Sequence, residues 1–593
     1  MRNMPKLPVP PLEETKERYI PWIAPFVSAD VLEEAKKCMA ELLAENSSGL
    51  LLQRELVKFA QREDVANWLE PFWIEAYLSE RRSLPLYSDN VFYKLALAPT
   101  GSELERIWRA ASLCHWAGKF YDLIRRKELT PDWDHGQMLC MSQYELLFGT
   151  TRIPRKKVDE IISFCAAGNA PFPTHITIMS EGNIAFVHIL DEDGNVLPVE
   201  RIASGLLYIL DNLKLQEGLK GAGVFTALPR EEWAAIWEDL ERVELNQPTL
   251  EKIKSSLFVM SFDDASPRSL KQFPIEGLVG SGENRWLDKS FSIIVFKDGQ
   301  VGVTMEHTCI DGSIMVRLCS YLVSKAREQK YVSFSKEDCL LWERGILYLN
   351  DILGKKLVDA KKWLASAKAK SFFRVIELEG IGRSSLRSRG LSPDAFCQLA
   401  LQLAHYKISG EFVNSYETVM MRHFYHGRTE ALRTVTSESK EFVMTMLNPT
   451  ASVDKKMGAF LKAKETHKKR IVQCKSAKGV ERHLFGLKSI YEHRDMFNLD
   501  IQKAPSLFES RSWKILNHSV IATSTSSTDG LELVCYGPVV EDGFGGRYLV
   551  FDDKVFFCLS CREPQAHVLE DLALNLVETM ETIYNMAESF ISV

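Results

Sequence analysis

The sequence predicts a soluble α/β protein built from more than one domain. The chain has 593 residues, of which 46% are hydrophobic and 26% are charged, as is typical of globular proteins. At roughly 100–200 residues per domain, this length suits two to four structural units. Apolar residues recur at helical spacing early in the chain, and β-type runs joined by turn residues appear later, so both kinds of element contribute.

The charge balance gives no reason to expect a nucleic-acid partner. Lys and Arg total 73 against 79 Asp and Glu, which gives a net charge of -6, whereas polyanion binding requires a basic face. No apolar run approaches the roughly 20 residues needed to span a bilayer. The first residues resemble neither a signal peptide nor a transit helix. We therefore expect an intracellular monomer, cytoplasmic by default, with a mitochondrial or peroxisomal location left open.

The first elements in chain order are helices. From Ser28 onward, one face of a predicted helix carries apolar residues at helical spacing, namely Val31, Ala35, Cys38, Met39 and Leu42. The polar turn residues Ser47-Ser48-Gly49 end this run. Further along, the Lys-rich stretch 355–370 alternates with apolar residues at helical period, which favours a solvated helix face.

Strands are predicted in two places. Residues 291–306 form two β-rich runs across the turn dipeptide Asp298-Gly299, a hairpin pattern that ends at His307. A second pair of strands is expected at 520–526 and 533–536, and residues 336–500 between the two pairs read as mostly helical.

The twelve cysteines lack paired spacing and indicate reduced thiols rather than a disulfide framework. The one CxxC, Cys558 to Cys561, lies in a strand-like alternating stretch. A lone pair makes a poor zinc site, so we predict a structural role and no bound metal.

His307 is the first candidate for chemistry. It stands in Glu306-His-Thr-Cys-Ile-Asp311-Gly312, where a histidine leaves a strand into a glycine-containing turn. A near-neutral pKa suits an imidazole to take a proton from an alcohol. HxxxDG strings occur in several acyltransferase families that use coenzyme A (CoA). The ordinary alternative is a hydrogen-bonded core histidine.

Three further strings contain polar groups that suit a site. Hydroxyls cluster at 524–528, where they could donate to an oxyanion or form a polar turn. Arginines 383, 387 and 389 precede a helix that begins at Ser392 and Pro393. These arginines could form a phosphate clamp or a solvated basic loop. Residues 416–433 and 481–488 are rich in polar and aromatic groups that could line a site. The alternative is that they form ordinary salt-bridged helices.

Taken together, these strings resemble the choline/carnitine acyltransferase family. Further matches are Leu7-Pro-Val-Pro-Pro-Leu12, Thr151-Arg-Ile-Pro154, Asn284-Arg-Trp-Leu-Asp-Lys-Ser290 and Gly537-Pro-Val-Val-Glu-Asp-Gly-Phe-Gly545. Their order and spacing hold over nearly the whole chain. The resemblance implies two chloramphenicol-acetyltransferase-like α/β domains, each a mixed sheet flanked by helices, with an active-site tunnel at their interface. The implied division is a helical segment at 1–85, a domain with the catalytic histidine at 86–349, and a domain that binds CoA and carnitine at 350–593.

The resemblance also implies roles for individual residues. His307 matches the general base, which deprotonates the acceptor hydroxyl so that it attacks the thioester directly, and Ser526 matches the serine that stabilises the oxyanion. Asp311 is expected to hold the loop by an ion pair. Arg383 and Arg387 match basic positions that grip the CoA 3′-phosphate, where better-known members have lysine. Asp394 falls near the pantetheine or adenine part. CoA is thus a co-substrate, and no cofactor is expected to be bound permanently.

Acceptor choice depends on a carboxylate, which carnitine has and choline lacks. Arg482, in Arg-His-Leu-Phe-Gly-Leu-Lys, matches the cation of carnitine-specific members, with Tyr416 and Thr429 as further carboxylate partners. An unpaired carboxylate in a tunnel is very costly, so L-carnitine is favoured. Ala431 departs from the threonine usual in carnitine enzymes.

Acyl-chain length depends on side-chain bulk before Gly537. Val534 stands where acetyl-preferring members have a large residue and longer-chain members have glycine, so the resemblance implies short acyl groups with some medium-chain tolerance. The alternatives are a choline O-acetyltransferase, a medium- or long-chain carnitine acyltransferase, a CoA-binding regulator without turnover, and an HxxxDG acyltransferase acting on plant-like alcohols.

Overall fold

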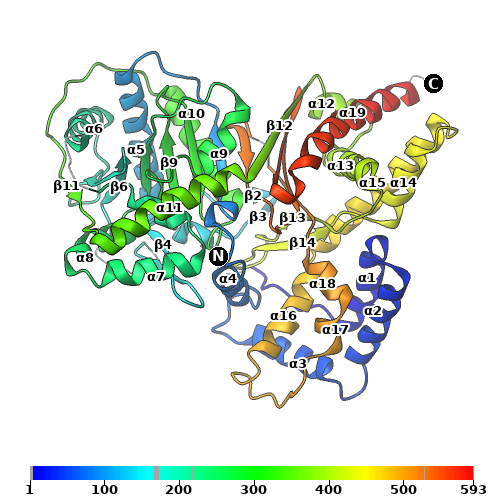
Figure 1. Ribbon diagram of the computed structural model, residues 1–593. Helices are drawn as coiled ribbons and strands as arrows, with labels where there is room; N and C mark the ends of the chain where they lie inside the picture. Colours follow the sequence, from blue (N-terminus) through cyan, green and yellow to red (C-terminus); the bar gives the residue numbers. More distant parts are fainter. Residues whose placement is uncertain (1–3, 166–171, 215–218, 527, 592–593) are drawn as a thin grey trace.

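The computed structural model describes residues 4–165, 172–214, 219–526 and 528–591. Two large β-sheets, each flanked by helices, lie side by side, and a group of helices lies below the second sheet in the view of Figure 1. The predicted α/β class is confirmed. Within the described ranges, no helix is both long and apolar enough to cross a bilayer.

The first sheet has eight strands, and in spatial order they are β11 (Trp342–Gly345), β7 (Asn183–His188), β6 (His175–Ser180), β8 (Val259–Phe262), β9 (Phe291–Val295), β10 (Val301–Met305), β1 (Val91–Leu95) and β16 (Leu531–Cys535). The sheet is mixed, because β8 runs parallel to β6 and β9 while the other pairs are antiparallel. Small antiparallel pairs lie outside it: β2 (Trp133–Asp134) with β3 (Gln137–Met138), and β4 (Thr150–Ile153) with β5 (Glu160–Ser163).

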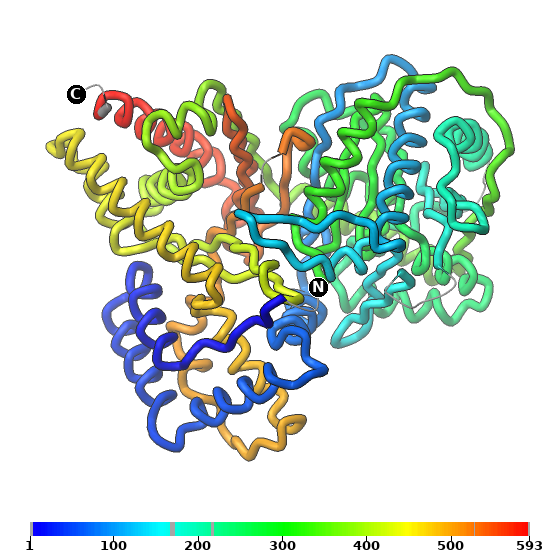
Figure 2. Tube along the Cα trace, turned by 180° about the vertical axis from the view of Figure 1, so that it is seen from behind, coloured from blue at the N-terminus to red at the C-terminus, as the bar shows by residue number. Residues whose placement is uncertain are grey.

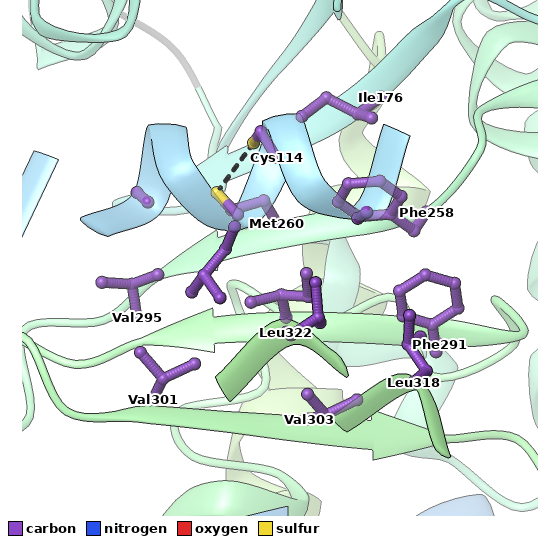
Figure 3. Close-up of a cluster of buried hydrophobic side chains, with 14 of the residues drawn as sticks. Cys114, Ile176, Phe258, Met260, Phe291, Val295, Val301, Val303, Leu318 and Leu322 are labelled. Atoms are coloured by element: carbon purple, nitrogen blue, oxygen red, sulfur yellow. Dashed lines mark hydrogen bonds between the residues drawn. The ribbon is translucent and has the colours of Figure 1, made fainter. Parts of the chain in front are cut away.

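Alternating residues of these strands face two layers of helices, as the two-residue side-chain period of a strand requires. One face packs against α5 (Glu103–Arg125), α6 (Val199–Lys214) and α10 (Gly312–Glu328). Figure 3 shows this core, where Cys114 of α5 reaches Met260 of β8 at 3.5 Å between the sulfurs. The other face is covered by α7 (Arg230–Glu241), α8 (Gln247–Ser255), α9 (Phe273–Leu278) and α11 (Asp351–Ala369).

The second sheet has six strands, in the order β12 (Ser371–Glu379), β18 (Lys554–Arg562), β17 (Phe544–Val550), β15 (Ile521–Thr525), β13 (Ser415–Met420) and β14 (Thr429–Arg433). Its core includes residues of α12 (Arg383–Ser388), α13 (Pro393–Ser409), α14 (Ser437–Leu447), α15 (Val453–Lys475) and α19 (Ala566–Ile591).

A third core joins the first and the late helices of the chain. It is built from α1 (Leu12–Ile23), α2 (Ala29–Leu42), α3 (Ser48–Gln61) and α4 (Glu70–Ser79), together with α16 (Glu481–Glu492), α17 (Ser506–Glu509) and α18 (Arg511–Asn517). Figure 2 shows the same grouping from behind, with the early helices in blue beside the late ones in orange. The predicted apolar face of α2 is confirmed, because its five apolar residues are all buried.

The hairpin at 291–306 is confirmed as β9 and β10, which pair in antiparallel register about Asp298-Gly299. The expected pairing of the two late strands is wrong, since β15 joins the second sheet and β16 pairs with β1 of the first. Residues 416–433 are a strand pair rather than a salt-bridged helix. The stretch 336–500 contains four strands besides its helices.

Two elements of 350–593 therefore lie with the first sheet. Strand β16 extends its edge, and α11 packs against the short helix η4 (Ala222–Ala227), with Leu353 and Leu357 in the apolar cluster on that face of the first sheet. The two sheets are thus tied together by the chain itself.

Candidate active site

A cavity of about 500 Å³ lies where the two sheets and the third helical group meet. Its walls come from α4, β1, the loop after β10, strands β13, β14, β15 and β17, and helix α16. The cavity brings together four of the residues expected to act in catalysis or to bind carnitine, His307, Tyr416, Thr429 and Arg482.

His307 lies two residues beyond β10, and its ring stacks on Tyr77 with centroids 5.6 Å apart. Its Nδ1 is buried and has no hydrogen-bond partner in the structure. Burial lowers the pKa of His307 below its usual value, although the Asp311 charge opposes the shift. The imidazole is therefore neutral at pH 7, which is the form that accepts a proton.

The loop after His307 is fixed by a buried ion pair. The Arg428 guanidinium donates to both carboxylate oxygens of Asp311, at 3.1–3.2 Å, and to the Thr308 carbonyl at 2.8 Å. Gln143 donates to Asp311 at 2.8 Å and accepts from its backbone N–H at 2.7 Å. Burial alone would raise the pKa of Asp311, but the Arg428 charge holds it below the usual value. The predicted loop-holding ion pair is confirmed.

Glu306 supports the same loop from the other side. Its carboxylate accepts from the Thr308 hydroxyl at 2.6 Å and from the Thr308 backbone N–H at 3.1 Å. Arg152 pairs with Glu306 at 3.3 Å, so residues on both sides of His307 are anchored by charged groups.

Arg482 is held on another wall by three partners. Its Nε donates to the Thr429 carbonyl at 3.1 Å, Nη1 donates to Glu481 at 2.9 Å, and the guanidinium lies 3.9 Å from the ring centre of Trp73. The side chain is only 5% exposed. Such a cation is pre-organised for an anion in the cavity, with part of its charge balanced by Glu481.

Tyr416 and Thr429 line the cavity near Arg482. The Tyr416 hydroxyl lies 2.9 Å from that of Thr418, and burial raises the pKa of Tyr416 so that it stays protonated. Beneath Arg482, the buried Glu430 accepts from the backbone N–H groups of Ala431 at 2.8 Å and Arg482 at 3.2 Å.

The serine cluster is bound by an arginine. Ser524 lines the cavity, whereas Ser526 is half-buried beside it and is not among the lining residues. Arg547 of β17 donates to both hydroxyls, from Nη1 to Ser524 and from Nη2 to Ser526.

The three residues expected to bind CoA lie outside the cavity lining. Arg383 is ion-paired with Asp552 at 3.0 Å, and Arg387 is exposed on the same short helix, α12. Asp394, at the start of α13, accepts from Tyr548 at 2.6 Å and lies 2.8 Å from the His467 ring.

Val534 also lies outside the lining. It is 1% exposed in the core of the first sheet, opposite Tyr93 of β1 in the strand register, and Tyr93 does line the cavity.

Several residues of the site were not predicted, because they are joined by contacts distant in sequence: Gln143, Arg428 and Arg547 as partners of predicted residues, and Trp73 and Tyr77 as aromatic walls. Arg428 directly precedes Thr429 in the sequence, and this adjacency is the signal that points to it.

Comparison with known proteins identifies the family. The profile described as choline/carnitine O-acyltransferase matches residues 7–578. The chain belongs to this family. Carnitine O-acetyltransferase from Homo sapiens is 28% identical over 594 residues, which cover 97% of this chain and 93% of the relative. Peroxisomal carnitine O-octanoyltransferase from Mus musculus is 30% identical over 609 residues, covering 99% and 97%.

Among solved structures, the trichothecene 15-O-acetyltransferase TRI3 from Fusarium sporotrichioides covers 87% of this chain and 93% of its own, with 12% identity and a TM-score of 0.38. This chain of the choline/carnitine O-acyltransferase family is a CoA-dependent acyltransferase.

Proposed function

We propose that this acyltransferase catalyses the reversible transfer of a short acyl group between CoA and the hydroxyl of L-carnitine. The observation that carries the proposal is that one cavity contains both a neutral buried histidine and a fixed arginine, His307 and Arg482. The first suits deprotonation of an alcohol, and the second suits a carboxylate on the same molecule.

The mechanism needs no acyl-enzyme. His307 removes the proton of the acceptor hydroxyl, and the oxygen attacks the thioester carbonyl carbon. The carbonyl oxygen becomes an oxyanion that accepts a hydrogen bond from Ser526. When the tetrahedral intermediate collapses, the C–S bond breaks and the imidazolium protonates the departing thiolate, which regenerates neutral His307.

A zwitterionic acceptor fits the polarity of the cavity. Its carboxylate would bind Arg482 with help from Tyr416 and Thr429, all of which line the same space. Its quaternary ammonium suits aromatic faces, and Tyr77 and Tyr536 are also in the lining. Choline offers no anion for Arg482, which supports carnitine over choline.

The acyl group is proposed to be acetyl or another short chain. The buried position of Val534, opposite Tyr93 in the strand register, supports this choice, since its side chain fills space that a long acyl chain would need. Relatives include enzymes named for both acetyl and octanoyl groups, so octanoyl transfer is the direct competitor.

The CoA side is proposed to be α12 and the start of α13. Arg383 and Arg387 would pair with the 3′-phosphate, and Asp394 would lie near the pantetheine or adenine part. Replacing both arginines by alanine should raise the KM for acetyl-CoA and leave that for acetyl-dephospho-CoA nearly unchanged. The division of the chain into segments 1–85, 86–349 and 350–593 is proposed as well.

The test is a thiol-release assay with acetyl-, octanoyl- and palmitoyl-CoA, each against L-carnitine and choline. Acetyl-CoA with L-carnitine should give the highest kcat/KM, and a preference for choline or palmitoyl-CoA would contradict the proposal. His307→Ala should abolish turnover while CoA binding persists. Arg482→Asn should raise the carnitine KM sharply and leave any choline activity intact.

A further inference from the structure

One cation of the cavity has no counter-charge. Four basic side chains with permanent charge line the cavity: Arg81, Arg482, Lys488 and Arg547. The first three are ion-paired, with Asp89, Glu481 and Glu492 respectively. Over the described part of the chain, no carboxylate lies within 4.0 Å of Arg547 as an ion-pair partner.

Arg547 is also buried within the second sheet. It lies on β17, between β15 and β18, and is 6% exposed. Its Nε is buried without a hydrogen-bond partner, while Nη1 and Nη2 donate to the Ser524 and Ser526 hydroxyl oxygens. An unpaired buried charge costs stability, and a cation held in this state at the cavity wall suits an anion that is present only in a bound or reacting state.

We propose that Arg547 is a positioning residue for acyl transfer, which holds and polarises the Ser526 hydroxyl so that this hydroxyl donates to the oxyanion. The inference rests on the proposed function of Ser526. Because the Ser526 oxygen accepts from Arg547, its own proton is free to donate to the carbonyl oxygen. As the acceptor oxygen bonds to the carbonyl carbon, an electron pair moves to that oxygen, and it returns when the C–S bond breaks. Arg547 forms no bond and stays protonated.

Arg547 and Arg482 are held on the cavity wall by different elements. Arg482 belongs to α16 and lies against Trp73, whereas Arg547 belongs to β17 and donates to Ser524 of β15 and to Ser526 just beyond it. A cation in a water-poor site is most useful where charge develops during the reaction, because it needs no reorganisation at that moment.

The test replaces Arg547 by methionine, which keeps much of the volume and removes the charge. With acetyl-CoA and L-carnitine, kcat should fall about tenfold to a hundredfold, with KM for both substrates nearly unchanged. The melting temperature should stay the same or rise, because an unpaired buried charge is removed. Arg547→Lys should recover part of kcat. Ser526→Ala with Arg547→Met should be little worse than Ser526→Ala alone, since the arginine acts through the serine.

Arg470→Met is the matched control. Arg470 is equally buried and lacks a carboxylate partner in the described ranges, but it donates to backbone carbonyls of Arg433 and Val435 outside the cavity. Its replacement should lower the melting temperature and leave kcat unchanged.

Each contrary result has a separate meaning. Unchanged kcat in Arg547→Met, with Ser526→Ala impaired, would overturn the inference and leave the proposed function intact. Unchanged kcat in Ser526→Ala would count against the proposed role of the serine. The Arg547→Met chain is also assayed with succinyl-CoA. If only its activity with succinyl-CoA falls, Arg547 binds an acyl carboxylate instead. A melting temperature lowered in step with activity would assign Arg547 a structural role.

Discussion

At the scale of single residues, the surroundings of His307 keep the imidazole neutral while it still lines the cavity, which suits its proposed role. Burial lowers its pKa, and the negative Asp311 restrains the shift while being neutralised in turn by Arg428. A general base of lowered pKa is fully available at pH 7 and loses activity only on acidification.

The pH dependence of kcat/KM tests this environment. Since the imidazole must be neutral, the acid limb should have its midpoint below the ordinary histidine value of 6.5. The measurement is the thiol-release rate from pH 5 to pH 8, repeated with propionyl-CoA to show that the limb belongs to the enzyme. A midpoint at or above 6.5 would contradict the burial argument.

Glu430 is a second buried titratable residue of this region, and it links stability to pH. Burial raises its pKa from 4.5 to about 7, against the opposing charge of Arg482. Between these values the folded chain keeps a proton that the unfolded chain loses, so this contribution to stability is complete below pH 4.5 and is lost as pH rises to 7. The shift corresponds to about 3 kcal/mol.

Glu430→Gln should therefore melt at a higher temperature than the unmodified chain at pH 8, and the difference should shrink at pH 5. The glutamine oxygen can still accept from the backbone N–H groups of Ala431 and Arg482. Glu465→Gln, at an exposed site on α15, is the control and should show no such pH-dependent difference. A destabilised Glu430→Gln chain at pH 8 would refute the sign of the linkage.

The sequence predicted those site residues whose proposed role follows from the local pattern around them. His307 follows a hairpin that alternation and a turn dipeptide define, and Asp311 stands in the same short string. Arg547 stands beside the quoted glycine string, yet its bonds to Ser524 and Ser526 join two strands more than twenty residues apart. Local periodicity assigns such a residue to a strand and says nothing of its partner.

At the scale of elements, the site depends on two loops held together across the molecule. The loop between β10 and α10 carries Asp311, and the turn before β14 carries Arg428. Both side chains are buried, so each charge depends on the other. The Arg428 guanidinium also donates to the carbonyls of His307 and Thr308, which ties the turn to the backbone of the proposed general base.

Arg428→Gln should lower the free energy of unfolding by about 3–5 kcal/mol, because it leaves the buried Asp311 carboxylate without its cation. Activity should fall as well, since the His307 loop loses its donors. Asp311→Asn combined with Arg428→Gln should cost less than the sum of the two single changes. Denaturant unfolding of the four chains measures this coupling, and additive losses would show that the pair is not a unit.

The late strands show where element prediction from sequence fails. Both β15 and β16 were recognised from their composition, but they were expected to pair with each other. The segment between them crosses from the second sheet to the first, so β16 pairs with β1, more than 400 residues earlier. Hydrophobic alternation is the same in either sheet, and only the global topology decides the partner.

At the scale of the whole molecule, the pairing of β16 with the first sheet joins the two sheets into one structural unit. One apolar cluster contains Phe92 and Ile294 of the first sheet, Leu533 and Cys535 of β16, and Cys558 of the second sheet. The cavity lies across the same junction, so relative motion of the halves would separate His307 from Arg482.

Thermal unfolding should consequently show one transition in which both sheets lose protection together, rather than separate melting of 86–349 and 350–593. Leu533→Ala removes a side chain that is 1% exposed at the junction, and it should destabilise the chain by about 2–5 kcal/mol without splitting that transition. Calorimetry together with hydrogen exchange in β9 and β18 reports the two sheets separately. Leu574→Ala, on the exposed face of α19 at 60% exposure, is the matched control and should change little. If β9 kept its protection after β18 had lost it, the halves would be independent folding units, and the junction would serve only to shape the cavity.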